Sequence, residues 1–177
     1  MCFNKWKNKK NLTFFTGGLM LTEKAELLID KLIAKGETLA VAESCTGGML
    51  SSKMTDVSGA SQVFLGGVVA YSNQLKSRLL NVNIGTIDQC GAVSADCAIE
   101  MCRGVLSNLA SDHAVSITGI AGPGGATAEK PVGLVYIAVG NSETIEAFES
   151  HFCGDRNEIR AQAVERAIEL LLNDILD

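Results

Sequence analysis

The chain has 177 residues, of which 47% are hydrophobic and 20% are charged, and its formal net charge is −5 at pH 7. This length suits one domain with a packed core, and the composition excludes a largely disordered chain. The weak negative charge argues against a general nucleic-acid binder, which would carry a basic face. A small anionic ligand is still compatible with it, because such a ligand needs only one local positive pocket.

The first nineteen residues differ in character from the rest of the chain. They carry several lysines and no acidic residue. Gly17 and Gly18 interrupt the apolar run that a signal peptide would need, and no stretch reaches the ~20 apolar residues of a membrane span. We therefore expect a flexible basic extension over residues 1–19, a single domain over residues 20–177, a cytoplasmic location and no membrane partner.

Six cysteines and two histidines show no metal-ligand spacing. The chain has no C-x-x-C pair, and His113 and His151 stand far apart, so the sequence predicts no structural zinc and no other metal site. Cys97 and Cys102 fall inside a helical pattern in a chain that is not small. Reduced thiols are therefore a better interpretation than a disulfide framework.

In the first half of the chain, helical and strand patterns alternate. Helical spacing of apolar residues begins at residue 21 and stops at Gly36. A short buried strand is predicted over residues 38–42, followed by a glycine turn and a second helix. Residues 62–71 predict another strand, and Ser72 is a suitable N-cap for a short helix after it.

In the second half, the strands are no longer separated by helices. Ser94 caps a longer helix whose apolar residues share one face, and a strand over residues 113–118 follows. Two further strands are predicted over residues 132–140 and 144–152. A capping box that begins at Asp155 starts the last helix.

This order of elements predicts an α/β domain with a mixed sheet. Helices between the first three strands imply parallel crossovers. No helix separates the last three strands, so at least one pair among them should be antiparallel. We therefore expect a mixed, mostly parallel sheet covered by helices.

Three polar or glycine-rich segments follow predicted strands. They are Glu43–Gly48, Tyr71–Lys76 and Thr118–Lys130. Ligands of open α/β sheets bind at the carboxyl ends of the strands, so these segments should converge on one site. That convergence is stronger support for a site than any one segment alone.

The segment Glu43–Gly48 allows two interpretations. Ser44 or Thr46 could simply cap the next helix, with the glycines letting helix and strand pack closely. Alternatively, Ser44 or Cys45 is a nucleophile at a helix start, where free N–H groups stabilise an oxyanion or hold a phosphate. Spacing alone does not choose between the serine and the cysteine.

A serine nucleophile needs a base, and the histidines are poorly placed. His113 begins a strand, at the wrong end for the site, although His151 near the end of the last strand is not excluded. Lys76 is the alternative, as in serine–lysine hydrolases. It lies near the positive end of a helix, so its pKa should fall, and Tyr71 could relay a proton or fix the lysine. The simpler interpretation makes both residues ordinary surface side chains.

The loop at 118–131 is neither a P-loop nor a dinucleotide-binding turn, because a strand and no helix follows it. Its glycine amides and Lys130 suit a phosphate or a sugar. Arg156 and Arg160 lie four residues apart on the last helix, where arginine suits bidentate phosphate contact. Pairing of these arginines with nearby acids such as Glu158 is about equally supported.

Five motifs in fixed order then carry a family resemblance: AESCTGG, GGVVAYSNQLK, GAVS, TGIAGPGG followed by EKPVG, and GDR. From about Leu21 to the C-terminus the chain resembles the CinA C-terminal domain family, which includes nicotinamide-nucleotide amidases. The resemblance implies a three-layer α/β/α fold with a mixed five-stranded sheet. It also implies hydrolysis of the carboxamide of nicotinamide mononucleotide to nicotinic acid mononucleotide and ammonia.

Carried onto this chain, the resemblance makes Ser44 the nucleophile, with Tyr71 and Lys76 as its activating pair. No cofactor and no metal are expected. An N-terminal domain of long family members is linked to nucleotide pyrophosphatase chemistry, and that activity is not transferred. The residues expected to bind substrate are Glu43, Cys45, Thr46, Gly47, Gly48, Thr118, Gly122, Gly124, Gly125, Lys130 and Arg156.

The alternative function is a non-catalytic nucleotide-binding module that acts through protein partners in DNA uptake or damage responses. Both interpretations predict a small-molecule nucleotide ligand, and neither predicts direct binding to nucleic acid. The high apolar fraction and an exposed sheet edge are compatible with a homodimer.

Overall fold

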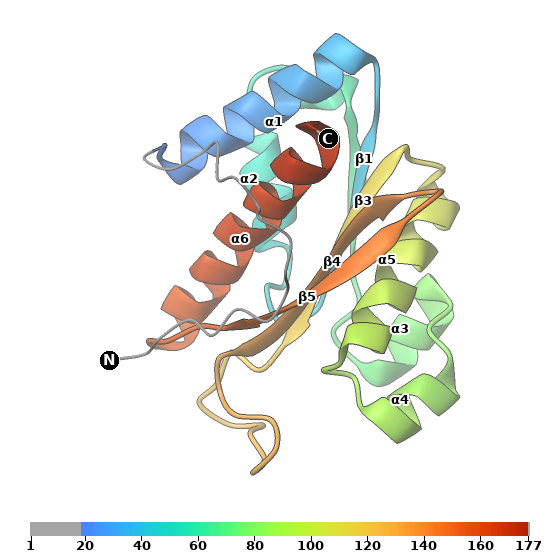
Figure 1. The fold of residues 1–177 in the computed structure, drawn as a ribbon, viewed down its shortest axis with the longest axis vertical. Coiled ribbons are helices and arrows are strands. Elements are labelled where there is room, and N and C mark those ends of the chain that lie inside the picture. The colour runs from blue at the N-terminus through green and yellow to red at the C-terminus, as the bar shows by residue number, and fades with distance from the viewer. Residues whose placement is uncertain (1–18, 177) are drawn as a thin grey trace.

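The computed structural model describes residues 19–176, so the extension predicted for residues 1–19 lies outside the described residues except for Leu19. A five-stranded sheet lies between two layers of helices, which confirms the expected three-layer α/β/α fold (Figure 1). The elements in chain order are α1 (Leu21–Lys35), β1 (Leu39–Glu43), α2 (Met49–Thr55), a 3₁₀ turn (Ala60–Gln62), β2 (Phe64–Val69), α3 (Asn73–Leu80), α4 (Ile84–Cys90), α5 (Ala95–Leu109), β3 (His113–Gly119), β4 (Leu134–Asn141), β5 (Ile145–His151) and α6 (Arg156–Leu176).

The sheet is mixed, with the strand order β2-β1-β3-β4-β5. Strand β1 pairs in parallel with both β2 and β3, whereas β4 pairs antiparallel with β3 and with β5. Four strands therefore run in one direction and β4 runs against them, as the missing helices between the last three strands predicted. The carboxyl ends of β1, β2 and β3 lie side by side at one edge of the sheet.

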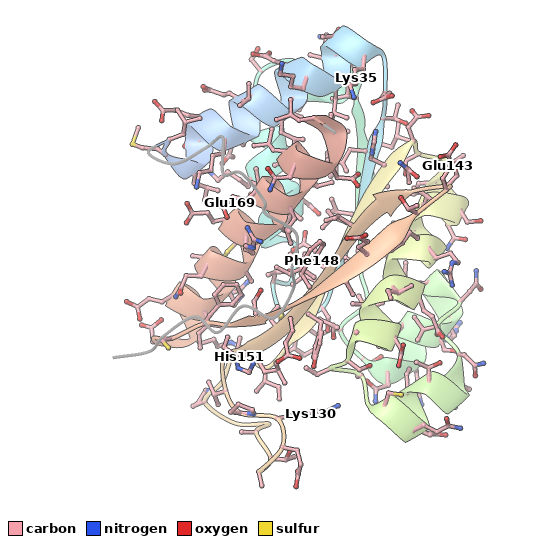
Figure 2. All side chains as sticks on the ribbon, viewed as in Figure 1. Lys35, Lys130, Glu143, Phe148, His151 and Glu169 are labelled. Carbon is pink, nitrogen blue, oxygen red and sulfur yellow. The ribbon has the colours of Figure 1, made fainter. Side chains whose placement is uncertain are left out.

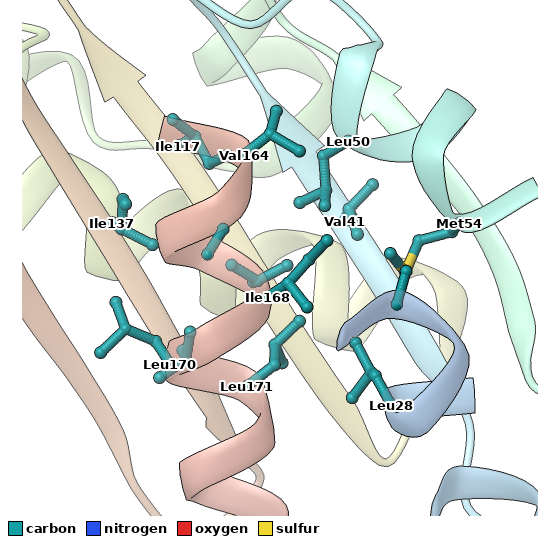
Figure 3. Packing of buried hydrophobic residues seen from close by; sticks show 14 of the residues in the cluster. Leu28, Val41, Leu50, Met54, Ile117, Ile137, Val164, Ile168, Leu170 and Leu171 are labelled. Carbon is teal, nitrogen blue, oxygen red and sulfur yellow. The ribbon is translucent and has the colours of Figure 1, made fainter. Parts of the chain in front are cut away.

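Helices α1, α2 and α6 cover one face of the sheet with branched apolar side chains. Figure 3 shows Val41 of β1 and Ile117 of β3 beneath Leu50 of α2 and Ile168 of α6. Each of these side chains is fully buried. Burying a side chain of this size stabilises the fold by about 1.5–3 kcal/mol, so this face anchors the strands that end at the site.

Helices α3, α4 and α5 lie on the opposite face, where the sheet presents small alanine side chains such as Ala40, Ala42 and Ala114. Small residues let helix α5 approach the sheet closely. Gly104 of α5 lies against the backbone carbonyl of Leu80 at the end of α3, where any Cβ would collide with it. This close contact fixes α3, the helix that carries Lys76.

Helix α4 was not predicted from the sequence, and its composition explains why. None of its residues is buried, so it has no apolar stripe that periodicity could detect. Its start depends on polar contacts. The side chain of Asn83 caps it, and the carboxylate of Glu100 on α5 accepts hydrogen bonds from the Asn83 amide and the Thr86 hydroxyl.

The cysteine interpretation is only partly right. Cys45, Cys90, Cys97 and Cys102 are free thiols, whereas Cys153 is disulfide-bonded. Within residues 19–176 no group of histidine, cysteine or acidic side chains is arranged to hold a metal ion. In the same part of the chain, no helix is both long enough and apolar enough to cross a membrane.

Candidate active site

A pocket of about 220 Å³ opens at the edge of the sheet where β1, β2 and β3 end. All three predicted segments contribute to its wall. The predicted residues that line it are Ser44, Cys45, Tyr71, Lys76, Thr118, Gly122, Gly124, Gly125 and Arg156. Glu43, Thr46, Gly47, Gly48 and Lys130 do not line it.

Ser44 follows directly after β1 and lies at the inner end of the pocket. Its amide donates a hydrogen bond of 2.9 Å to the carbonyl of Ile117 on β3, which fixes the backbone where the strand ends. Its hydroxyl accepts a hydrogen bond of 2.9 Å from the amine of Lys76. The serine and the lysine, 32 residues apart in sequence, are thus a direct pair.

Lys76 lies in helix α3 and is only 2% exposed. Its amine also donates to the carbonyl oxygens of Ala70 at 3.0 Å and Tyr71 at 3.3 Å, where the chain leaves β2. Within the described part of the chain no carboxylate forms an ion pair with it. Burial lowers the pKa of this amine below its ordinary value of 10.5. The sequence predicted this direction from the positive helix end, but the main cause is loss of water.

Glu43 has a different role from the one predicted, and it corrects the capping prediction as well. This fully buried carboxylate accepts hydrogen bonds from the amides of Gly48, Leu50 and Ser51 and from the Ser51 hydroxyl, at 2.7–3.1 Å. Glu43 therefore satisfies the start of helix α2, a task that the sequence assigned to Ser44 or Thr46. Its negative charge also offsets the positive end of that helix.

The turn after Ser44 offers fewer free amides than the sequence suggested. The amide of Gly47 donates to the carbonyl of Ser44 at 3.1 Å, and that of Gly48 donates to Glu43. Among the described residues, no acceptor on another residue takes the amide hydrogens of Cys45 and Thr46. Of the two residues only Cys45 lines the pocket, so its amide is the candidate oxyanion donor beside the serine.

Cys45 lines the pocket, but its thiol is held in the neutral form. Burial raises the pKa of the Cys45 thiol to about 11. A thiol needs its thiolate form to act as a nucleophile, so this shift disfavours Cys45 near neutral pH. The electrostatics of the pocket therefore favour Ser44 over Cys45.

Tyr71 does not contact the amine of Lys76 through its phenol. The ring is 61% exposed at the pocket rim, and its oxygen accepts a hydrogen bond of 3.2 Å from Arg156. The same guanidinium donates at 2.6 Å to the carbonyl of Gly122 in the glycine-rich loop. Arg156 thus joins two segments across the mouth of the pocket.

The two other predicted cations hold backbone carbonyls outside the pocket. Arg160 donates to the carbonyl of Thr46 at 2.6 Å, in the turn between β1 and α2. Lys130 donates to the carbonyls of Cys90 at 2.5 Å and Val93 at 2.7 Å. Neither residue lines the pocket, so Arg156 is the lining cation at its exposed side.

Sequence reasoning missed part of the pocket wall. Ala92 and Val93 line it from the GAVS motif, and Asn73 lines it from the first position of α3. The GAVS motif supported the family resemblance, but no local chemistry assigned it a role. Small apolar side chains give no such signal, and only the packing of the turn beside β3 reveals them.

The two histidines lie outside the pocket. His113 at the start of β3 faces Glu37 and Asp174, as expected for the wrong end of the sheet. His151 lies at the end of β5 (Figure 2), where it is exposed and bonded to Glu149, and it does not line the pocket. The basic side chain that the structure brings to the Ser44 hydroxyl is therefore Lys76.

Comparison with known proteins identifies the family and supports the fold. A model of the CinA C-terminal domain matches residues 21–175. The chain belongs to the CinA C-terminal domain family. It is 46% identical over 152 residues to a putative competence-damage inducible protein of Caldicellulosiruptor bescii, and 51% identical over 150 residues to a CinA-like protein of Thermotoga sp. strain RQ2. These matches cover 86% and 84% of this chain but only 37% and 36% of the relatives.

Solved CinA structures share the fold closely. The competence/damage inducible protein CihA of Agrobacterium tumefaciens matches with a TM-score of 0.84 and 38% identity, over 86% of this chain and 93% of that one. A CinA superfamily protein of Klebsiella pneumoniae matches with a TM-score of 0.86 and 34% identity, over 89% and 99%. The chain thus spans little more than a third of the curated relatives above but nearly all of these solved domains.

Proposed function

We propose that this domain is an amidohydrolase that converts nicotinamide mononucleotide and water to nicotinic acid mononucleotide and ammonia. The observation that carries the proposal is the 2.9 Å contact between the Ser44 hydroxyl and the Lys76 amine. Both residues are buried and line the pocket, and within residues 19–176 no carboxylate forms an ion pair with Lys76. A serine next to a lysine that burial shifts toward the neutral form is suited to acyl transfer.

A neutral Lys76 amine has two N–H groups and one lone pair, so in this form its contact with Ser44 reverses direction and the hydroxyl becomes the donor. Two N–H groups donate to the carbonyls of Ala70 and Tyr71. The lone pair is then left for the hydroxyl hydrogen of Ser44. In this state Lys76 accepts the serine proton as the oxygen attacks the carboxamide carbon. Tyr71 supports the lysine through its backbone carbonyl, while its phenol contributes to the pocket rim.

The negative oxygen of the tetrahedral intermediate lies against the amide of Cys45, which lines the pocket. One such donor contributes about 3 kcal/mol to transition-state stabilisation in well-characterised hydrolases. The hydrogen bonds of Glu43 and Gly47 fix this turn before substrate binds. The turn therefore needs little reorganisation during the reaction.

Protonated Lys76 returns its proton to the carboxamide nitrogen, and the carbon–nitrogen bond breaks to release ammonia. The nicotinoyl group is then esterified to Ser44. A water molecule gives a proton to Lys76 and attacks the ester carbon. The product carboxylic acid leaves as the serine oxygen regains its hydrogen. These steps use only protein groups and water.

The polar part of the nucleotide binds at the exposed side of the pocket. Arg156, Gly124 and Gly125 are exposed on this side of the pocket, and the buried Gly122 also lines it. A guanidinium with nearby backbone amides suits a phosphate. The cavity of about 220 Å³ is of a size for a small molecule and not for a macromolecule.

Ammonia release from nicotinamide mononucleotide tests this proposal. We expect wild type and Cys45→Ala to release ammonia and Ser44→Ala to lose nearly all turnover. Mass analysis after acid quench should find a nicotinoyl-nucleotide adduct on the peptide that contains Ser44. Turnover that survives in Ser44→Ala but not in Cys45→Ala would reassign the nucleophile.

A second candidate function is a nucleotide-binding module without catalysis. The names of the relatives, which refer to competence and damage, favour it. The module would bind nicotinamide mononucleotide in the same pocket and act through protein partners. Binding by calorimetry without any ammonia release from wild type would support this candidate and exclude the amidase.

A further inference from the structure

Lys130 connects the long loop between β3 and β4 to the turn that precedes helix α5. It lies between that loop and helix α4 (Figure 2), and its amine donates to the carbonyls of Cys90 and Val93 at 2.5 and 2.7 Å. We propose that Lys130 is a positioning residue that fixes the pocket wall formed by Ala92 and Val93. It thereby sets substrate affinity without touching the substrate.

The backbone of Lys130 is itself anchored. Its amide donates to the Thr127 hydroxyl at 3.1 Å, and its carbonyl accepts from the Thr127 amide at 2.9 Å. These reciprocal bonds close a turn at the end of an otherwise exposed loop. The lysine amine therefore reaches its two carbonyls from a fixed base.

The turn that it contacts depends on side chains for its order. The carbonyls of Cys90 and Val93 accept from Lys130, that of Ala92 accepts from the Thr118 hydroxyl at 2.7 Å, and that of Gly91 accepts from Ser94 at 2.9 Å. Four successive carbonyls are thus satisfied by side chains. Lys130 alone supplies half of these bonds, so its loss would free both ends of the turn.

Gly91 provides an independent sign that this contact shapes the backbone. Its φ is +79°, a conformation that favours glycine, and an added Cβ would lie 2.7 Å from the Lys130 amine. Only glycine at position 91 therefore lets the turn approach the Lys130 amine this closely without displacing it. A side chain at position 91 should push the amine from its carbonyls.

The consequence for the site follows from the pocket lining. Ala92 and Val93 line the pocket, whereas Lys130 does not. Loss of the lysine contacts should loosen the wall and raise the KM, while Ser44 and Lys76, on other segments, keep their contact. The expected kinetic signature is a change in KM with little change in kcat.

Hydrogen exchange and kinetics on the full chain test this role, and only the kinetic arm rests on the proposed function. The variant is Lys130→Met, and the matched control is Lys53→Met, which removes a surface pair with Asp56. We expect Lys130→Met to lose about 10-fold in amide protection where α4 ends and α5 begins, and to raise the KM about 10-fold. Its kcat should stay within about 3-fold of wild type, as should every parameter of the control.

Gly91→Ala is a second way to disturb the contacts between Lys130 and the turn. Its effect on exchange at the turn should be smaller in the Lys130→Met background than in wild type, because the contact that it disrupts is already gone. Additive effects would show that the glycine acts independently of the lysine and would overturn the proposed coupling.

The remaining outcomes also decide the proposal. Unchanged exchange at the turn in Lys130→Met overturns it, whether or not wild type releases ammonia. Exchange that rises equally in β3 and β4 overturns it too, because the lysine would then serve general stability. Local loosening with an unchanged KM rejects the link to substrate. Absence of ammonia release from wild type would remove the amidase proposal but leave the exchange result decisive for the lysine.

Discussion

Two buried lysines of this fold occupy opposite electrostatic environments. Lys24 on α1 is 5% exposed and Lys76 on α3 is 2% exposed. The amine of Lys24 forms ion pairs of 2.7 Å with Glu165 and Glu169 on α6. Among residues 19–176, the hydrogen-bond partners of the Lys76 amine are one hydroxyl and two carbonyls.

The charge state of a buried lysine depends on its partners as well as on its burial. Burial lowers the pKa of Lys24, but hydrogen bonds and charge from the two glutamates outweigh it, so the pKa is raised. Burial lowers the pKa of Lys76, and no carboxylate contact offsets it. The first lysine holds two helices together as a cation, and the second is suited to act as a base.

Exchanging each lysine for methionine should separate the two roles most clearly in turnover. Lys76→Met removes the proposed base, so we expect kcat to fall by about 10³-fold while the fold is retained. Ammonia release from nicotinamide mononucleotide measures the loss, and circular dichroism checks the fold. Lys24→Met, as the matched control, should keep its kcat. Equal activity in the two variants would contradict the comparison.

The pH dependence of turnover tests the charge state directly. Only neutral Lys76 can accept the serine proton, so kcat/KM should fall as the pH drops through the lowered pKa of this amine. The midpoint of the acidic limb should lie below the ordinary lysine value of 10.5. Rates measured from about pH 5 to about pH 10 would show it. A profile without a limb in this range would contradict the assignment of Lys76 as the base.

The free energy of unfolding should depend on Lys24 more than on Lys76, the reverse of the order expected for turnover. Lys24→Met leaves Glu165 and Glu169 without their shared cation, and Glu169 is mostly buried. Because Glu165 is 42% exposed, we expect a loss of only about 2 kcal/mol in unfolding free energy. Urea titration measures this difference. A loss below the error of the titration would show that the buried pair adds no net stability.

His113 extends the comparison to a third buried base. A hydrogen bond that the His113 ring donates to Asp174 outweighs burial and, with Glu37, raises the pKa of His113 above 6.5. Its contribution to stability is therefore complete below about pH 6.5 and is lost as the pH rises through the raised value. We expect His113→Gln to cost about 1 kcal/mol at low pH and less at high pH. Urea titrations at both pH values would reveal a constant difference if the ion pairs contribute nothing.

Local patterns predicted most of the fold. Apolar spacing located α1, α5 and α6, and the absence of helices between the last three strands correctly predicted an antiparallel strand. The capping box of α6 is present, with the Asp155 carboxylate accepting from Glu158 and the Glu158 carboxylate accepting from Asp155. Helix α4 was missed because it buries no side chain, so no periodic signal exists.

The residue types of the site were visible in the sequence, but their partners were not. The sequence predicted Ser44, Lys76 and Arg156 as site residues, since each follows a strand or lies near the start of a helix. The backbone partners of Glu43 and Lys130 were not predicted, because a carboxylate and an amine bind the nearest unsatisfied backbone groups once packing brings them together. Those backbone groups lie on segments that no local pattern connects.

The sequence by itself determined the order of the elements other than α4, the mixed sheet, the family and the edge at which the pocket opens, because these follow from periodicity and motif order. Only the tertiary structure decided that Glu43 caps a helix and that Lys130 holds a turn. It also decided that Lys76 is buried and that, among residues 19–176, no carboxylate pairs with it. The reason is physical. Hydrogen bonds and pKa values depend on which groups meet and how much water they lose, and folding sets both.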